Sequence, residues 1–587
     1  MQDSLSSSYR YPLLVALVVA CIYTIADFSN IRAMHFLDPD DILRLIQVRD
    51  LLNGQAWFDV TQYRINPPAG GLMHWSRLID LPLAALIVIL RPIFGQPVAE
   101  HIALISYSLL MLTALFLVAA RILRLYYRPG LVLVGLPAIV FLQLLMSQFR
   151  VMRIDHHSAQ ILIGCVAFGL VVAPWRRWTG LAVGALLAVL TSISLEGIIY
   201  IPAFGLVFAW PWLMRGKNGD PLAGYCLSFV LTSVIVMVAT RGASAPLTSY
   251  CDSMSRPYLA ASAMAALILL VGTRWRLPVF LRLCVVVIAG AAATGTLGLS
   301  DARCLRGPFE ALPPFVQTYW YDMVEEGMPL WGKGTQAFNF ILLHVIAITG
   351  IGIALYQHRR DKELYRRWLI TAFLYGWALA VGLIVLRANG MAYAFGLGGI
   401  ALVTLHCWQK ARAISNTLVR ILASVATPVL VAMLLQLILF PSADHQSLMA
   451  RAGTNASQAL CFDPASLAKL NSLPSGLVFT TIDMAPEILL NTPHSVVATG
   501  HHRNANGIDK TLRAFRASSE GARPIIASTG SDYLIYCASE ANIPPFAQLG
   551  PEALSNRLKN KQPPAWLTPV EMPRGSTLQV YRITPDV

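Results

Sequence analysis

Residues 98–120 read VAEHIALISYSLLMLTALFLVAA, an apolar run long enough to cross the roughly 30 Å hydrocarbon core of a bilayer as one α-helix. The whole chain has this character, because 56% of its 587 residues are hydrophobic, only 13% are charged and the mean hydropathy is +0.57. This composition excludes an ordinary globular protein and predicts a polytopic α-helical membrane protein. The net charge of +14 does not indicate nucleic-acid binding, because most basic residues lie in short loops, where they set membrane topology.

About thirteen segments have the composition of transmembrane helices, which need about 20 residues each. They cover residues 11–31, 98–120, 131–147, 156–173, 179–195, 198–214, 221–240, 259–273, 277–297, 336–356, 367–386, 391–408 and 419–440. Lys and Arg are concentrated in every second loop, so the positive-inside rule predicts that these loops and the N-terminus are cytoplasmic. An odd number of spans then places the C-terminus outside the cytoplasm. If the protein is bacterial, we expect it in the inner membrane.

The chain is therefore expected to have a transmembrane domain over residues 1–440 and an extracytoplasmic soluble domain over residues 441–587. Two large outer loops, residues 32–97 and 298–335, belong to the first domain. The C-terminal segment is more polar, and its short apolar runs alternate with helical patterns, which predicts a mixed α/β domain.

Two cysteines, Cys461 and Cys537, lie in this C-terminal segment. Outside the cytosol such a pair can form a disulfide. The sequence equally allows two buried free thiols, so both alternatives stay open.

Acidic and histidine residues adjoin several apolar segments, all on the predicted outer side. Asp38 and His74 lie in the first outer loop, Asp155 and His157 begin the fourth segment, and Glu326 lies in the second large loop. Charged groups near hydrocarbon are costly and usually serve a function. Carboxylate and imidazole ligands suit Mg²⁺ or Mn²⁺, and zinc is less favoured because no cysteine joins the set. The pattern predicts one extracytoplasmic site that binds a divalent cation.

Four motifs in this order resemble those of oligosaccharyltransferase catalytic subunits, which are integral-membrane glycosyltransferases of the GT-C class, especially the archaeal type. The matching stretches are DPDDILR (38–44), PAGGLMHW (68–75) followed by LID (78–80), DHH (155–157) and EGMP (326–329). The resemblance covers most of the chain. That family also has thirteen spans followed by an outer soluble domain, so it implies a GT-C fold here.

The resemblance implies roles for the residues of these motifs. Asp38, Asp155 and His157 would be metal ligands, with His74 as a further ligand or as a residue that supports one of the ligands. Asp38 and Glu326 would orient or deprotonate the acceptor, and the loop that carries Glu326 would close over the bound donor.

Basic residues would bind the phosphate of the donor, where negative charge develops during transfer. Arg387 is the first candidate, although it is offset by a few residues from the position that the family uses. Arg153, beside the DHH motif, is the second; its alternative role is simply to flank the membrane.

The acceptor site departs from the family pattern. Family members that glycosylate Asn-x-Ser/Thr carry Trp-Trp-Asp at the start of the C-terminal domain, whereas this chain has TTIDMAP at residues 480–486. Asp483 is kept as the candidate acceptor-binding residue, but both Trp residues are missing. The sequence therefore also allows acceptors other than a protein asparagine.

Structural roles are alternatives at several of these positions. Asp40 or Asp41, or less favourably Asp38, is an alternative N-cap of the loop helix that follows, and Asp155 is a candidate cap for the fourth segment. Arg387 is alternatively an interface anchor. Glu196, between two apolar segments, has no assigned role.

We therefore expect an enzyme that transfers a sugar or oligosaccharide from a polyprenyl-phosphate or polyprenyl-diphosphate donor to an extracytoplasmic acceptor, with the help of Mg²⁺ or Mn²⁺. The acceptor would be a glycolipid, a polysaccharide or a protein. One alternative is a metal-independent GT-C transferase with a monophosphate donor, in which Asp38 acts alone as a base. A transporter of lipid-linked substrates is less favoured, because the halves of the chain show no clear inverted repeat.

Overall fold

The protein is described here by a computed structural model of residues 9–216, 219–333, 335–427, 461–538, 546 and 549–584. The chain divides into two compact units. Unit 1 comprises Met1–Arg32, Ser76–Glu310 and Met328–Ala443, and unit 2 comprises Ala33–Trp75, Ala311–Gly327 and Asp444–Val587. Unit 2 thus includes the C-terminal domain and parts of the two segments that the sequence suggests are outer loops.

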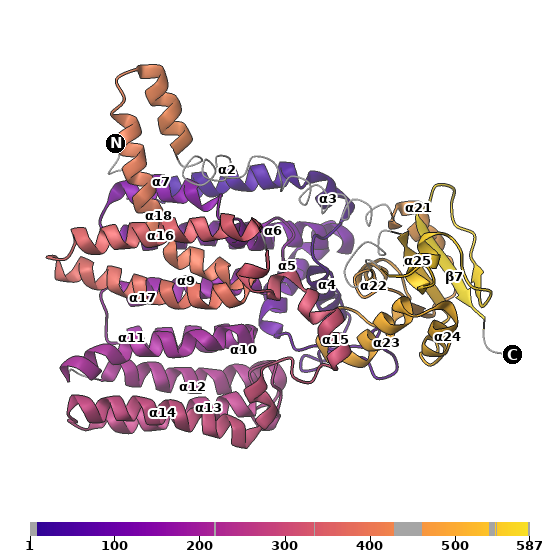
Figure 1. The fold of residues 1–587 in the computed structure, drawn as a ribbon, viewed down its shortest axis with the longest axis horizontal. Helices are drawn as coiled ribbons and strands as arrows, with labels where there is room; N and C mark the ends of the chain where they lie inside the picture. The colour runs from indigo at the N-terminus through magenta and orange to yellow at the C-terminus, as the bar shows by residue number, and fades with distance from the viewer. Residues whose placement is uncertain are drawn as a thin grey trace. The chain divides into compact units, whose positions relative to one another are not determined.

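Unit 1 is built of helices, most of which run side by side (Figure 1). Its α-helices are α2 (Arg10–Ala26), α5 (Arg77–Phe94), α6 (Gln96–Arg124), α7 (Pro129–Ile139), α8 (Gln143–Met146), α9 (His157–Val172), α10 (Thr179–Ile193), α11 (Tyr200–Arg215), α12 (Asp220–Arg241), α13 (Arg256–Arg274), α14 (Val279–Ser300), α16 (Thr335–Gln357), α17 (Lys362–Ile384) and α18 (Asn389–Arg412). The short helix α3 (Phe28–Ala33) ends at the first boundary between the units.

Eight helical segments among the described residues are long and apolar enough to cross a membrane. A bent pair, α7 followed by residues 143–149, would make a ninth. Four shorter apolar helices, Arg10–Ala26, His157–Val172, Thr179–Ile193 and Thr417–Thr427, coincide with other predicted spans. The helical membrane architecture therefore agrees with the sequence, while the number of thirteen crossings stays a prediction. Residues 428–440 of the last predicted span lie outside the described residues.

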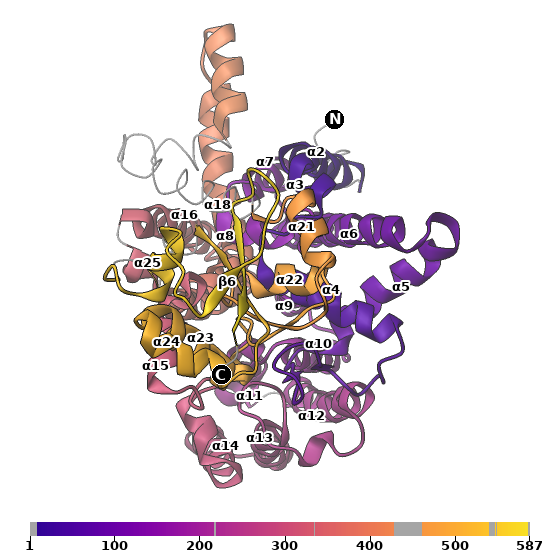
Figure 2. The same cartoon turned by 90° about the vertical axis from the view of Figure 1, so that its right-hand side faces the viewer.

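Helices α10 and α12 pack closely in unit 1, as both views show (Figure 1, Figure 2). Gly180 and Gly184, four residues apart on one face of α10, lie against the backbone of α12. A Cβ atom at Gly184 would be only 2.3 Å from the carbonyl oxygen of Tyr225. Small residues at this spacing let membrane helices approach until their backbones touch.

One helix of unit 1 lies where the sequence suggests an outer loop. Helix α5 contains Pro82 and Pro92 and begins with the ion pair Arg77–Asp80, whose N–O distance is 3.1 Å and whose side chains are fully buried. Two prolines and three charged residues, Arg91 being the third, interrupt the apolar pattern, which is why the sequence shows no span here.

Unit 2 contains a five-stranded mixed sheet in the order β4-β3-β5-β7-β6. Strand β3 (Leu477–Phe479) is parallel to β4 (Ser495–Val496) and β5 (Tyr533–Cys537), whereas β7 (Leu578–Ile583) is antiparallel to β5 and β6 (Leu567–Pro569). The helices of this part are α21 (Pro464–Asn471), α22 (Ala485–Asn491), α23 (Ala505–Arg516), α24 (Ser519–Ala527) and α25 (Leu554–Lys559). The expected mixed α/β architecture is present in this segment.

The N-terminal segment of unit 2 contains α4 (Pro39–Leu52) and a small hairpin, β1 (Thr61–Gln62) with β2 (Gly71–Leu72). Gly70 precedes β2 with φ +76°, and a Cβ there would lie 2.6 Å from the Thr61 side chain, so this turn requires glycine. Helix α15 (Pro314–Tyr319) also belongs to unit 2 and packs on α23.

Two disulfides join described residues. Cys461 and Cys537 are paired in unit 2, which resolves the alternative that the sequence leaves open. Cys251 and Cys304 are paired in unit 1, and the sequence pattern does not indicate this bond. Disulfides are typical of segments that fold in an oxidising compartment.

Candidate active site

Asp155 and the two histidines after it form a buried cluster at the start of α9 in unit 1. The Asp155 carboxylate contacts both rings: Oδ1 lies 2.6 Å from Nδ1 of His156, and Oδ2 lies 2.5 Å from Nδ1 of His157. The rings stack with centroids 4.2 Å apart. One carboxylate thus fixes the orientation of two imidazoles, a role that the sequence motif does not reveal for His156.

This cluster fits a divalent cation. One ligand atom from each of Asp155, His156 and His157 can be chosen so that all lie within 4.8 Å of one another. Nε2 of His157 is buried and makes no hydrogen bond with any described residue, as expected for a nitrogen that takes a ligand. A histidine that binds metal through one nitrogen usually holds a carboxylate with the other. Imidazole ligands suit Mn²⁺ and Zn²⁺, and a carboxylate suits Mg²⁺ and Mn²⁺, so the donor set does not select one of these three ions.

A second charged pair lies near this cluster. The Arg387 guanidinium forms an ion pair with the Glu196 carboxylate. Both charges interact with His157 through space, so the pair belongs to the same neighbourhood. Glu196 comes from the 3₁₀ helix η2 (Leu195–Ile199) and Arg387 from η8 (Leu386–Ala388). The structure therefore gives Glu196, unexplained by the sequence, a partner.

Arg153, the other predicted phosphate-binding residue, is also buried in unit 1. Its Nη2 donates to Oε1 of Gln148 at 3.0 Å. Its role at the donor phosphate is not tested by this contact and stays a prediction. Neighbouring Arg150 forms an ion pair with Asp27.

Asp38, in unit 2, is the N-cap of α4: its Oδ1 accepts a hydrogen bond of 2.9 Å from the backbone N–H of Asp40. Of the three aspartates that the sequence offers as caps, Asp38 has this role, and the favoured alternatives Asp40 and Asp41 do not. Pro39 occupies the first turn, where its missing N–H costs nothing, and so the helix starts one or two residues earlier than the sequence suggests.

Asp38 and Asp483 line the same cavity of unit 2, about 50 Å³ in volume. Partial removal from water, and secondly the charge of Asp38, raise the pKa of Asp483 to about 6. The two carboxylates, which come from segments far apart in the sequence, therefore act on each other. Thr481 and Ile482, the two residues before Asp483, follow β3 and are buried.

Glu325 and Glu326 lie in the 3₁₀ helix η6 (Glu325–Gly327) of the second large loop. Glu325 is exposed and Glu326 is half-buried. Helix α15 anchors the preceding part of this loop within unit 2. The Arg513 guanidinium lies 4.0 Å from the Phe315 ring, and that of Arg516 lies 3.8 Å from the Tyr319 ring.

His74 lies among other histidines of unit 2. Its Nδ1 is 2.9 Å from Nε2 of His501, and its ring centroid is 4.7 Å from that of His502. The sequence indicates no such grouping, because His74 and the His501–His502 pair are separated by most of the chain.

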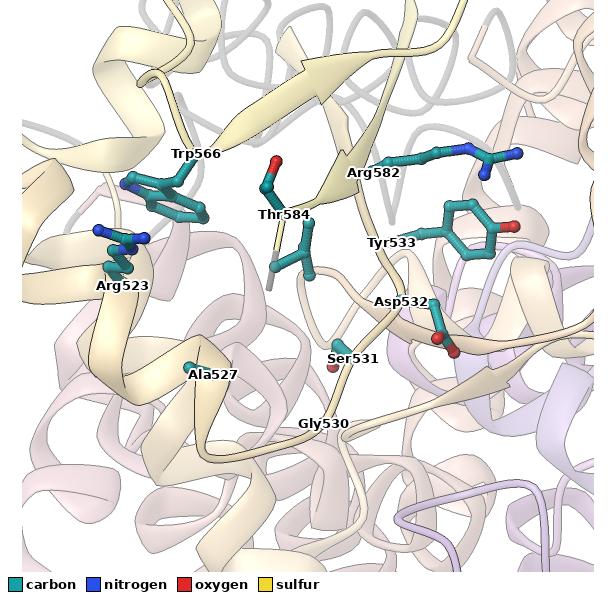
Figure 3. Close-up of a pocket in the computed structure, with 10 residues that line it drawn as sticks. Arg523, Ala527, Gly530, Ser531, Asp532, Tyr533, Trp566, Arg582 and Thr584 are labelled. Atoms are coloured by element: carbon teal, nitrogen blue, oxygen red, sulfur yellow. The ribbon is translucent and has the colours of Figure 1, made fainter. Parts of the chain in front are cut away.

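A larger pocket, of about 490 Å³, lies in unit 2 at the start of β5 and the end of β7. Figure 3 shows Arg523, Trp566, Tyr533 and Arg582 around it. None of the predicted site residues lines this pocket.

The arrangement of the helical unit, with buried carboxylate, imidazole and guanidinium groups, is that of a membrane protein with an internal polar site, and its fold is that of GT-C oligosaccharyltransferases. The chain aligns with archaeal oligosaccharyltransferase AglB from Archaeoglobus fulgidus, solved with an inhibitory peptide and a dolichol-phosphate. The TM-score is 0.63 at 13% identity, over 95% of this chain and 72% of that one.

Two further solved structures of Archaeoglobus fulgidus oligosaccharyltransferase are similar. One, tethered to an acceptor peptide with the NVT sequon, gives a TM-score of 0.61 at 14% identity over 98% of this chain and 74% of that one. Another, a complex with Zn and sulfate, gives 0.53 at 13% identity over 89% and 68%. The predicted oligosaccharyltransferase-like GT-C fold is confirmed. No known family profile matches the sequence, and no curated protein matches it either.

Proposed function

We propose that this protein is an integral-membrane glycosyltransferase that transfers a sugar or oligosaccharide from a polyprenyl-phosphate or polyprenyl-diphosphate donor to an extracytoplasmic acceptor. The observation that carries the proposal is the buried Asp155–His156–His157 cluster near the Glu196–Arg387 ion pair, in a helical unit of oligosaccharyltransferase fold. The similar proteins are seen with a dolichol-phosphate and with an acceptor peptide, which supports a lipid-linked donor.

Arg387 is the proposed donor-phosphate ligand. When the sugar C1 leaves the phosphate, negative charge develops on the phosphate oxygens, and a planar guanidinium can donate two parallel hydrogen bonds to them. Glu196 holds the guanidinium in place before the donor arrives. The donor phosphate would then replace the Glu196 carboxylate as the partner of Arg387, or bind the guanidinium together with it. The positive charge of Arg387 is therefore neutralised both before and after the donor binds. Arg153 is a second proposed phosphate ligand.

Asp155, His156 and His157 would hold a divalent cation, with Asp38 proposed as a further ligand. Such a cation supplies positive charge that stabilises the departing phosphate. The Asp155 carboxylate also keeps both rings in a fixed tautomer and orientation, because it accepts hydrogen bonds from their Nδ1 atoms when these carry the proton.

Asp38, Glu326 and Asp483 are proposed to act on the acceptor. A carboxylate that accepts a hydrogen bond from the attacking hydroxyl or amide orients it and increases its nucleophilicity. Thr481 and Ile482, which stand before Asp483 in place of the two Trp residues of Trp-Trp-Asp, leave Asp483 without aromatic neighbours from this stretch of chain. The acceptor is accordingly proposed as a glycolipid, a polysaccharide or a protein, without a preference for Asn-x-Ser/Thr.

The test is mass spectrometry of lipid-linked glycans, glycolipids, polysaccharides and glycoproteins. The cells lack the chromosomal gene and carry a wild-type or variant copy on a plasmid. We expect Asp38→Ala and Arg387→Ala to accumulate a lipid-linked glycan and to lose one glycosylated product. The matched control is Arg359→Ala, which replaces an exposed arginine between α16 and α17 and should behave as wild type. Unchanged glycans in both site variants would refute the proposal.

The role of the cation is tested with purified protein and the accumulated donor. Exhaustive chelation should abolish transfer, and Mn²⁺ or Mg²⁺ should restore it. Transfer that persists under chelation would favour the metal-independent GT-C mechanism instead.

A further inference from the structure

In unit 1 the chain passes from α17 to α18 through a short break that carries Arg387. Val385 is extended, with φ −129° and ψ 111°, so the helical pattern of α17 ends there and α18 begins at Asn389. Carbonyl groups at a helix end have no partner inside the helix and must find one elsewhere. Inside a membrane unit such a break is kept when neighbouring side chains satisfy these groups.

Asn389, two residues after Arg387, satisfies two carbonyl groups of the break. Its side chain is fully buried, and Nδ2 donates to the carbonyl oxygens of Gly382 and Leu386, both at 2.8 Å. These two acceptors use both hydrogens of the amide and show which of its ends is the nitrogen. The other end, Oδ1, therefore faces His344, where it lies 2.8 Å from Nε2.

His344 of α16 holds this amide in place. Because Oδ1 of Asn389 can only accept a hydrogen bond, Nε2 of His344 carries a proton. The other ring nitrogen, Nδ1, lies 3.0 Å from the hydroxyl oxygen of Tyr375 in α17. The ring also stacks on Tyr393 of α18, with centroids 4.7 Å apart. One buried imidazole thus links three helices at the break, and a buried polar network whose members all have partners favours a single arrangement.

A glycine makes room for the amide. A Cβ at Gly382 would lie 2.4 Å from Oδ1 of Asn389 and 2.8 Å from its Cγ. Gly382→Ala would therefore displace the amide without removing any hydrogen-bonding group. Gly376 lies on the same helix, and a Cβ there would meet no atom of the described residues within 4 Å. Gly376→Ala is thus a matched control.

The backbone is held on both sides of Arg387. The Leu386 N–H donates to the Met328 carbonyl at 2.9 Å, and the Ala388 N–H donates to the Val385 carbonyl at 3.1 Å. The Leu386 carbonyl accepts one of the amide hydrogens described above. The peptide groups next to Arg387 therefore have defined positions, and the side-chain network sets one of them.

We infer that His344 and Asn389 are positioning residues for Arg387. They fix the break from which the guanidinium reaches Glu196 and, in the function proposed above, the donor phosphate; this last step rests on the proposed function. A guanidinium donates two parallel hydrogen bonds to phosphate only when its plane has the right orientation. A fixed backbone lowers the conformational entropy that the arginine loses on binding. Both residues act through Arg387 and not by contact with the donor.

The first measurement follows Arg387 without any substrate. The full-length protein in detergent micelles is labelled at arginine with a nitrogen isotope visible by NMR, and Arg387→Lys identifies the Nε–H resonance of Arg387 by its loss. We expect His344→Leu, Asn389→Ala and Gly382→Ala each to shift this resonance, because the guanidinium no longer keeps its place. Unfolding curves establish that each variant is folded.

The controls separate positioning from a general change of structure. Gly376→Ala should leave the resonance unchanged, and so should His406→Leu, which replaces a histidine bonded to the Leu402 carbonyl of its own helix at 2.8 Å. His344→Gln should restore most of the wild-type signal, because the glutamine Nε2 can donate where the imidazole Nε2 does. An unchanged resonance in folded His344→Leu, or in Gly382→Ala, would overturn the inference.

The second measurement is the affinity for undecaprenyl phosphate in the same micelles. Arg387→Ala should weaken binding about 10- to 100-fold, the loss expected for a charge-assisted hydrogen bond, and His344→Leu about 10-fold. The double variant should bind no more weakly than Arg387→Ala, because His344 acts through Arg387. Losses that multiply in the double variant would show that His344 acts by another route and would overturn the inference.

The two measurements also separate this inference from the proposed function. If the resonance shifts as expected but Arg387→Ala binds undecaprenyl phosphate as tightly as wild type, the positioning of Arg387 is confirmed and its proposed role at the donor phosphate is refuted.

Discussion

Gly184→Ala should destabilise the helical unit although alanine is the better helix former. The added Cβ would lie 2.3 Å from the carbonyl oxygen of Tyr225 and 3.0 Å from the backbone nitrogen of Phe229, whereas ordinary contacts begin at 3.4 Å. Both atoms belong to the backbone of α12, so no side-chain rotation relieves the clash. Helices α10 and α12 must separate locally by about 1 Å, which loses contacts along the rest of their interface.

Overpacking of this kind costs about 1–3 kcal/mol, which exceeds the gain of up to about 1 kcal/mol from replacing glycine in a helix. Gly376→Ala in α17 is the matched control, because a Cβ there meets no atom within 4 Å. The control should keep only the helix-propensity gain, so the two variants should differ by about 2 kcal/mol. The measurement is reversible unfolding in mixed detergent micelles, followed by circular dichroism. If Gly184→Ala proves as stable as the Gly376→Ala control, the close backbone contact does not exist.

Three further outcomes are expected. Arg513→Ala and Arg516→Ala should each loosen the loop helix α15 by about 0.5–1 kcal/mol, the usual value of an exposed cation–π contact, and limited proteolysis around residue 320 should become faster; unchanged cleavage would contradict the contacts. The Cys461–Cys537 bond closes a loop in the unfolded chain, so breaking it should lower the stability of unit 2 by about 4 kcal/mol. The unfolding midpoint should therefore be lower in reductant than in oxidant, and equal midpoints would argue against the bond. Arg387→Lys keeps the charge but not the planar fork, so kcat/KM for the lipid-linked donor should fall about 10- to 100-fold, and full activity would show that Arg387 does not bind phosphate.

Apolar runs predict the helical membrane fold because burial in hydrocarbon requires continuous stretches that the sequence displays directly. Interrupted helices are harder to predict. Helix α5 contains Pro82 and Pro92 and the buried Arg77–Asp80 pair, and in the sequence these residues are typical of a loop. Among the candidate caps of α4 the sequence favours Asp40 or Asp41 over Asp38, since Pro39 fits the loop before a helix as well as it fits the first turn of one.

The candidate site was predictable where its residues are contiguous. Asp155 and His157 stand in one short motif, so their joint role is visible in the sequence. Glu196 and Arg387 are far apart in the chain, and nothing local indicates that they form an ion pair. The same holds for Asp38 and Asp483, to which the resemblance gives separate roles and which only the folding of unit 2 brings to one cavity. Polar pairs between residues far apart in the chain can be identified only from the tertiary structure, because charged residues show no periodic pattern in the sequence that would indicate their partners.

The Cys251–Cys304 bond bears on how the chain is assembled. Cys251 follows α12 and Cys304 follows α14, so the hairpin of α13 and α14 lies between the bonded thiols. If both helices of that hairpin cross the membrane, the two thiols emerge on the same side only after the second helix has been inserted. The bond would then form late and record successful insertion, and a non-reducing gel of newly made chains would follow the biogenesis of this region directly.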